Sequence, residues 1–123
     1  MHTIAAIALA VFLIAHGVGH FLRPDYFRTL VPSWLSRAGL LVVASGVAEI
    51  AVGALVLIPQ GRAVGGWAAA AMIAIFLASH LDALFRASSD RPRLMDRPIG
   101  AVARLAVNLC YIGWAVAVAL TAR

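Results

Sequence analysis

Four long apolar stretches dominate the sequence and leave few residues for any other kind of structure. They cover residues 1–21, 39–58, 63–85 and 99–122 of a chain of 123 residues. A helix needs roughly 20 consecutive apolar residues to cross the hydrocarbon core of a bilayer, and each stretch has about that length. The sequence therefore predicts an all-α integral membrane protein, in which residues 1–123 form one domain built as a bundle of four transmembrane helices.

The composition excludes an ordinary water-soluble domain. Hydrophobic residues make up 63% of the chain and charged residues only 12%, with a mean hydropathy of +0.96. Soluble domains average about 45–50% apolar and about 25% charged residues, so a soluble version of this chain would have almost no polar surface. We expect everything that the protein does to happen in or at the membrane.

The connections between the apolar stretches are short. The first contains two prolines, which interrupt a helix, and three aromatic residues of the kind that favour a membrane interface: Pro24, Pro32, Tyr26, Phe27 and Trp34. It predicts a short interfacial segment, with a helix near residues 25–30. The second connection, residues 59–62, is a tight turn that makes its two flanking helices antiparallel neighbours. The third is polar and ends at Pro98, which suits the first turn of a helix.

The basic residues predict an orientation in the membrane. The net charge is +5, and the basic residues are ten arginines. Most of them lie in short loops beside apolar stretches, which fits lipid headgroups and topology signals, so no nucleic-acid partner is predicted. The first and third connections hold Arg23, Arg28, Arg37, Arg86, Arg91, Arg93 and Arg97, and the opposite side holds only Arg62 and Arg123. This bias predicts that loops 1 and 3 lie in the cytoplasm and that both termini lie outside.

Several polar side chains interrupt the apolar stretches. They are His16, His20, Glu49, His80, Arg104 and Asn108. An ionisable group at the centre of a membrane helix costs about 2.5–3.5 kcal/mol on insertion scales, so such groups are usually functional. At about 1.5 Å of rise per residue, all six lie in the same half of the bilayer.

The spacing of these residues predicts one polar site inside the bundle. His16 and His20 are i,i+4 neighbours on one helix face, and Arg104, Asn108 and Tyr111 follow one another on a face of the last helix. The predicted ligand-binding residues are His16, His20, Glu49, His80, Arg104, Asn108 and Tyr111. Glu49 would pair with Arg104 or with a histidine, and Glu49 and His20 are the candidates for proton exchange. The alternative is that these groups only fix the helices in register.

A metal centre is the other chemistry that such residues suggest. His16, His20, His80 and Glu49 offer ligands suited to Zn, Cu or Fe. An H-x3-H pair is common, however, no CxxC or HExxH motif accompanies it, and Arg104 would repel a cation. No metal or haem site is predicted. Asp82, four residues before Arg86, is explained by an interfacial ion pair.

Short motifs in the first half of the chain resemble a known family. They are GVGHF at 17–21 followed by Pro24, VP at 31–32, SGVAE at 45–49, LIP at 57–59 and Arg62. In this order they resemble the pattern of the DoxX-like family of small bacterial membrane proteins. The second half departs from that pattern, with ASH at 78–80 where the family usually has PAN, and RLAVN at 104–108 where it usually has RLPLQ.

The resemblance implies a four-helix fold in the bacterial cytoplasmic (inner) membrane, with His20, Glu49 and Arg104 as signature groups. Family namesakes are linked to quinone-dependent sulfur oxidation and to terminal oxidase assemblies, and relatives act as partners of redox complexes or as membrane chaperones. A quinone is accordingly the cofactor that the resemblance suggests. The lipid bilayer and a membrane redox complex, or another protein, are the implied partners.

Three classes of function follow from the residues and the resemblance. The first is an accessory or quinone/amphiphile-binding component of a membrane redox system, in which Arg104 and Asn108 contact the oxygens of a head group while Glu49 and His20 exchange protons. The second is a membrane chaperone or assembly factor without chemistry of its own. The third is an intramembrane acid–base enzyme, such as an isomerase, so the sequence leaves enzymatic activity open. Four short helices leave little room for a channel or transporter pore.

Overall fold

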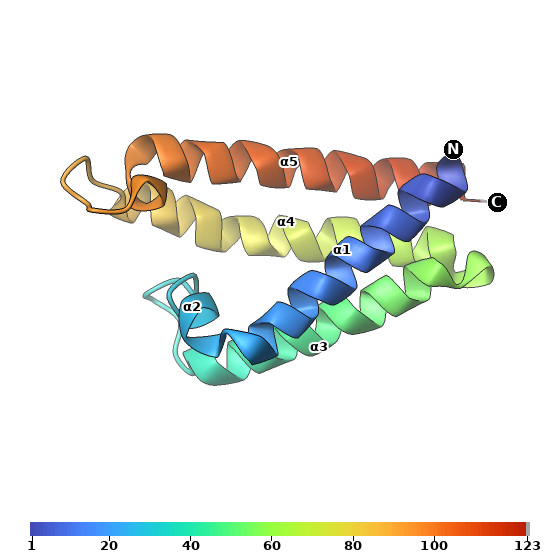
Figure 1. Ribbon diagram of the computed structural model, residues 1–123, viewed down its shortest axis with the longest axis horizontal. Coiled ribbons are helices and arrows are strands. Elements are labelled where there is room, and N and C mark those ends of the chain that lie inside the picture. Colours follow the sequence, from blue (N-terminus) through green and yellow to red (C-terminus); the bar gives the residue numbers. More distant parts are fainter. Residues whose placement is uncertain (123) are drawn as a thin grey trace.

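The computed structural model describes residues 1–122, and within them the only regular secondary structure is helical. The long helices lie lengthwise beside one another and are joined by short connections (Figure 1). In chain order the elements are α1 (His2–Leu22), α2 (Pro24–Arg28), α3 (Ala38–Leu57), the 3-10 turn η1 (Pro59–Gly61), α4 (Arg62–Arg86), the 3-10 turn η2 (Leu94–Asp96) and α5 (Pro98–Thr121).

The four long helices correspond to the four apolar stretches of the sequence. Each begins and ends within one residue of the range expected from the apolar pattern. All four are long and apolar enough to cross a membrane. The all-helical class and the four long helices are therefore confirmed. The short helix expected near residues 25–30 is α2, and Pro98 is the first residue of α5, where the missing N–H of proline costs no hydrogen bond.

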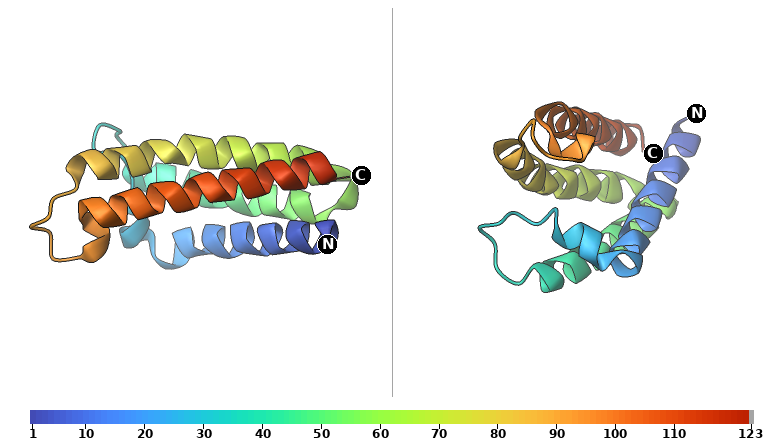
Figure 2. Two further views of the ribbon diagram at one scale, coloured as in Figure 1. Left: turned by 90° about the horizontal axis from the view of Figure 1, so that it is seen from above. Right: turned by 60° about the vertical axis from the view of Figure 1, so that its left-hand side comes forward.

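The long helices run up and down and associate as two pairs. The most extensive contacts join α1 to α3 and α4 to α5, and α3 contacts α4 less extensively beyond the tight turn η1. Both chain termini lie at one end of the bundle, and α2 lies at the other (Figure 1). From the end that carries the termini, the two pairs diverge toward α2, as the turned view in Figure 2 also shows.

Small residues allow the helices within each pair to approach closely. A Cβ atom on Gly17 of α1 would lie only 2.8 Å from the carbonyl oxygen of Gly46 in α3, and one on Gly66 of α4 would lie 2.8 Å from the Cα atom of Ala119 in α5. Close backbone approach is a principal source of packing energy between membrane helices. The α1–α3 crossing consequently needs glycine at both of its contact positions.

The hydrophobic core lies where the two pairs meet, toward the termini. Its fully buried members are alanines and medium-sized aliphatic residues from all four long helices: Ala6, Leu9, Ala10, Leu13, Val56, Ala69, Ala115 and Val118. At the same end Trp114 donates a hydrogen bond from Nε1 to the carbonyl oxygen of Ala5, at 3.1 Å, which ties α5 to α1. The pairs are thus joined firmly at one end of the bundle, and the space between them widens toward the other.

Candidate functional site

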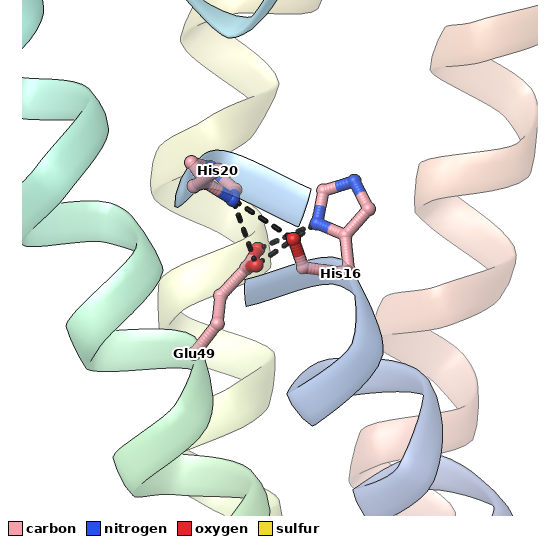
Figure 3. A network of polar contacts seen from close by, with 3 residues as sticks. All are labelled: His16, His20 and Glu49. Atoms are coloured by element: carbon pink, nitrogen blue, oxygen red, sulfur yellow. Dashed lines mark hydrogen bonds and ion pairs between the residues drawn. The ribbon is translucent and has the colours of Figure 1, made fainter. Parts of the chain in front are cut away.

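The carboxylate of Glu49 lies between two histidine rings in the interior of the bundle. His16 Nδ1 donates to both carboxylate oxygens, at 3.0 Å to Oε1 and 2.9 Å to Oε2. His20 Nδ1 lies 3.5 Å from Oε2 and also donates to the backbone carbonyl oxygen of His16 at 3.0 Å. Figure 3 shows both rings reaching from α1 toward the carboxylate of α3. Glu49 is only 2% exposed, so these imidazoles are its principal polar surroundings.

The close helix crossing builds this cluster. His16 and His20 lie one helical turn apart and so share a face of α1. Gly17, between them, is so close to α3 that an added Cβ would come within 3.0 Å of the Cβ of Glu49. Two small residues at the crossing therefore bring a carboxylate on one helix within hydrogen-bond distance of imidazoles on the other.

Aromatic rings cover the histidines. Phe27 of α2 stacks on His20, with ring centroids 3.9 Å apart, and meets His16 edge-on at 5.3 Å. Phe12 stacks on the His16 ring at 5.8 Å. Within this setting the side chain of His20 is 7% exposed, whereas that of His16 is 45% exposed. His16 is thus the accessible member of the cluster.

A cavity of about 580 Å³ lies between the two helix pairs, on the side of the bundle toward α2. Its walls are mainly apolar, and they include Leu13, Leu30, Leu41, Val42, Ile73 and Phe76. Small-molecule sites in proteins typically measure about 300–1,000 Å³ and combine apolar walls with a few placed polar groups. This cavity has both properties, because the cluster of His16, His20 and Glu49 forms part of its wall.

The polar groups of α4 and α5 line the same cavity. They are His80, Arg104, Asn108 and Tyr111. His80 Nδ1 and Arg104 Nε are buried and have no hydrogen-bond partner among the described residues. Asn108 Nδ2 donates back to the carbonyl oxygen of Arg104 at 2.8 Å, and the Tyr111 ring lies 4.6 Å from that of Phe12. Two residues of this wall, His80 and Arg104, therefore each carry a buried polar atom without a protein partner in the described part of the chain.

The structure thus brings all seven residues expected at the site to one cavity, but divides them into two groups. Glu49 pairs with histidines, and Arg104 forms no salt bridge with it among residues 1–122. Fixing helix register would account for the hydrogen-bonded cluster on α1 and α3. It leaves the partnerless Arg104 unexplained. Asp82, by contrast, pairs with Arg86 at 2.7 Å, as the sequence predicted.

Some residues of the site had not been singled out from the sequence. Phe12 and Phe27 line the cavity together with the expected residues. Phe27 had been grouped with the interfacial aromatic residues of the first connection, yet it is 9% exposed and packs on both histidines. The sequence carries no local signal for this contact, since it depends on how α2 folds back over α1.

The cluster also has the composition of a metal site. One ligand atom each from His16, His20 and Glu49 lies within 4.8 Å of the other two. Imidazole and carboxylate are ligands of zinc and of other first-row transition metals. Chemically, the site thus offers an acid–base pair, a potential ligand set and, across the cavity, partnerless polar atoms able to bind oxygens.

Comparison with known proteins gives a family and no further relative. No curated protein and no solved structure matches the chain. One family model matches, described as Domain of unknown function (DUF8561), and it covers residues 9–119. The match includes nearly all of the four long helices and every residue of the site. The chain belongs to this family, DUF8561.

Proposed function

We propose that the protein is a multi-pass protein of the bacterial cytoplasmic membrane that binds a quinone-like amphiphile in the cavity between its helix pairs. In this proposal it serves as an accessory component of a membrane redox system. The tail of the amphiphile lies against the apolar walls, and its head group lies between the cluster of His16, His20 and Glu49 and the polar groups of α4 and α5.

The outer surface of the bundle supports insertion into a membrane. Large apolar side chains outside the cavity are between 59% and 86% exposed on all four long helices: Ile4, Leu40, Val64, Phe85, Ile99 and Leu120. Soluble monomers rarely expose contiguous apolar patches larger than a few hundred Å². A hydrocarbon environment accounts for such a surface, and the arginine-rich connections favour placing the α2 end of the bundle at the cytoplasmic face.

The observation that carries the ligand proposal is the pair of partnerless polar atoms in the cavity. A buried polar group without a hydrogen bond costs about 1–3 kcal/mol, and more if it is charged. Arg104 Nε and His80 Nδ1 are two such atoms, and both residues line the cavity. In our proposal a carbonyl oxygen of a bound head group accepts a hydrogen bond from the guanidinium of Arg104, which is partly exposed and lines the cavity.

The cluster on the other wall supports a head group that exchanges protons. Reduction of a quinone to a quinol takes up two electrons and two protons. The electrons would come from a partner protein of the redox system, and His16, accessible from the cavity and hydrogen-bonded to Glu49, would relay the protons. His20, buried behind it, orients the carboxylate. The resemblance of residues 17–62 to the DoxX-like pattern supports the same class of ligand.

Trp34 provides a direct test. It lines the cavity, whereas Trp67 and Trp114 do not. Purified protein in a neutral detergent is titrated with a benzoquinone that carries a decyl tail, and the quenching of tryptophan fluorescence is followed. We expect saturable quenching that Trp34→Phe largely removes. Solvent extracts of the purified protein, analysed by mass spectrometry, should contain a co-purified quinone or related amphiphile.

A matched pair of variants separates the cavity from the apolar exterior. Ala103 and Ala106 are both exposed residues of α5, but only Ala103 lines the cavity. Ala103→Phe should weaken quinone binding at least tenfold by filling the cavity, and Ala106→Phe should leave it unchanged. If the quenching does not saturate, or if Ala103→Phe and Ala106→Phe bind the quinone equally well, the quinone only partitions into detergent. The proposal would then be wrong.

A further inference from the structure

We infer that His16, His20 and Glu49 form a binding site for one divalent first-row transition-metal ion, with two imidazole nitrogens and a carboxylate oxygen as ligands. This site goes beyond the proposed binding of an amphiphile and does not depend on it. The inference rests on the separations of the three ligand atoms, on their chemistry and on their surroundings.

The ligand atoms already have nearly the separations that a metal ion imposes. Bonds of about 2.0–2.2 Å to nitrogen and oxygen place neighbouring ligand atoms about 3.0 Å apart in octahedral and about 3.4 Å apart in tetrahedral geometry. The Oε2 atom of Glu49 lies 2.9 Å from His16 Nδ1 and 3.5 Å from His20 Nδ1. All three ligand atoms fall within 4.8 Å of one another, so a small rotation of the accessible His16 ring would complete the set.

The ligand types are those of well-known metal centres. Two histidines and one carboxylate form the facial triad of non-haem Fe(II) sites, and the same set binds catalytic Zn(II), with water or substrate in the remaining positions. An ion would also offset the negative charge of Glu49, which is 2% exposed and therefore costly to keep unbalanced in hydrocarbon.

The surroundings leave one side of the site open. The ring of Phe27 covers His20, and Glu49 is a buried residue of α3. His16, by contrast, has a side chain that is 45% exposed and lines the cavity. Water or a ligand in the cavity could therefore reach the remaining coordination positions of the ion.

Two features oppose metal binding: the hydrogen bond that His20 already makes, and the positive charge of Arg104. Neither prevents it. His20 Nδ1 donates to the carbonyl oxygen of His16, so metal binding would exchange this hydrogen bond for a coordinate bond and place the ring proton on Nε2. Arg104 repels cations, which is why the sequence alone predicted no metal. It belongs to the other helix pair and makes no salt bridge with Glu49, so the carboxylate is left to the ion.

The test uses full-length protein made without a polyhistidine tag and stripped with EDTA. It is titrated with Zn(II) by calorimetry and with Co(II) by visible absorption, whose intensity reports the coordination number of the ion. We expect one ion per chain. His16→Gln and Glu49→Gln should each weaken binding at least tenfold, and circular dichroism checks that both variants stay helical. His2→Gln is the matched control, because it removes an exposed imidazole outside the site.

The outcomes separate this inference from the amphiphile proposal. The absence of stoichiometric binding, or binding that survives both His16→Gln and Glu49→Gln, would overturn the metal site. So would binding that is lost in His2→Gln. If Glu49→Gln fails to fold, His16→Gln decides alone, because its side chain is half-exposed. The quinone titration is performed on the EDTA-treated protein, so failure of one proposal leaves the other measurable.

Discussion

His16 Nδ1 lies almost equally far from the two carboxylate oxygens of Glu49, at 3.0 and 2.9 Å, and this contact joins α1 to α3 in the interior of the bundle. The imidazole is accessible from the cavity, whereas the carboxylate is buried. The contact thus links a side chain that faces the cavity to one that is shielded from water. This difference is the basis of the functional proposals and of the first prediction below.

Removal of the carboxylate should destabilise the α1–α3 pair. Glu49→Ala leaves His16 Nδ1 without its acceptor and removes the carboxylate that lies 3.5 Å from His20 Nδ1. The loss of a buried hydrogen-bond partner costs about 1–3 kcal/mol. Ser45→Ala, one turn earlier on α3 and also at the cavity, should change stability by less than about 0.5 kcal/mol. Reversible unfolding in mixed micelles containing EDTA measures both. Equal effects of the two substitutions would show that the buried cluster contributes no stability.

A methyl group at the α1–α3 crossing should be poorly tolerated. In Gly17→Ala the new Cβ would lie 2.8 Å from the carbonyl oxygen of Gly46, so the helices must move apart. We expect a loss of about 1–3 kcal/mol, as for other overpacked cores. A Cβ on Gly113 meets no atom within 4 Å, so Gly113→Ala should be neutral or stabilising by up to about 1 kcal/mol through helix propensity. Thermal unfolding in detergent compares the two.

Arg104 should contribute strongly to quinone affinity. Its Nε atom is buried without a protein partner, and a hydrogen bond to a charged group contributes about 1.5–3 kcal/mol. Arg104→Gln should therefore raise the Kd for the decyl-benzoquinone about 10- to 150-fold. Arg93→Gln removes the same charge from an exposed position outside the cavity and should leave the Kd unchanged. If both variants weaken binding equally, only the net charge matters.

Chemical labelling should reveal the orientation of the chain. Cys110 is the single cysteine, so Cys110→Ser gives a background without thiols. In that background Ser88→Cys tests the connection between α4 and α5, and Gln60→Cys tests the turn η1 at the opposite end. In intact cells a membrane-impermeant maleimide should label the cysteine at position 60 and leave the one at position 88 unlabelled until the membrane is opened. The reverse pattern would mean that the arginine bias misplaces the loops.

The sequence predicted the helices well because one strong physical signal determines them. Apolar runs of about 20 residues must form helices if their backbone polar groups are to be satisfied in hydrocarbon. Proline and glycine in the connections then mark their ends, as at Pro59 and Pro98. Which helices pair with one another was harder to predict from the sequence. Contacts such as that between Gly66 and Ala119 depend on which small residues of different helices meet.

The sequence predicted the members of the candidate site better than their partners. The i,i+4 spacing of His16 and His20 fixes their common face, so their position beside Glu49 could be anticipated. The sequence could not show that Glu49 pairs with histidine rather than with Arg104. That pairing depends on the rotation and separation of whole helices. The packing of Phe27 on His20 is a tertiary contact of the same kind.

The placement of the termini has a practical consequence. Both ends of the chain lie at the closed end of the bundle, whereas α2, which helps to line the cavity, lies at the other end (Figure 1). A fluorescent protein or an immobilisation handle fused at either end would consequently sit at the end of the bundle opposite α2, so the chain can be tagged or immobilised there without covering the cavity.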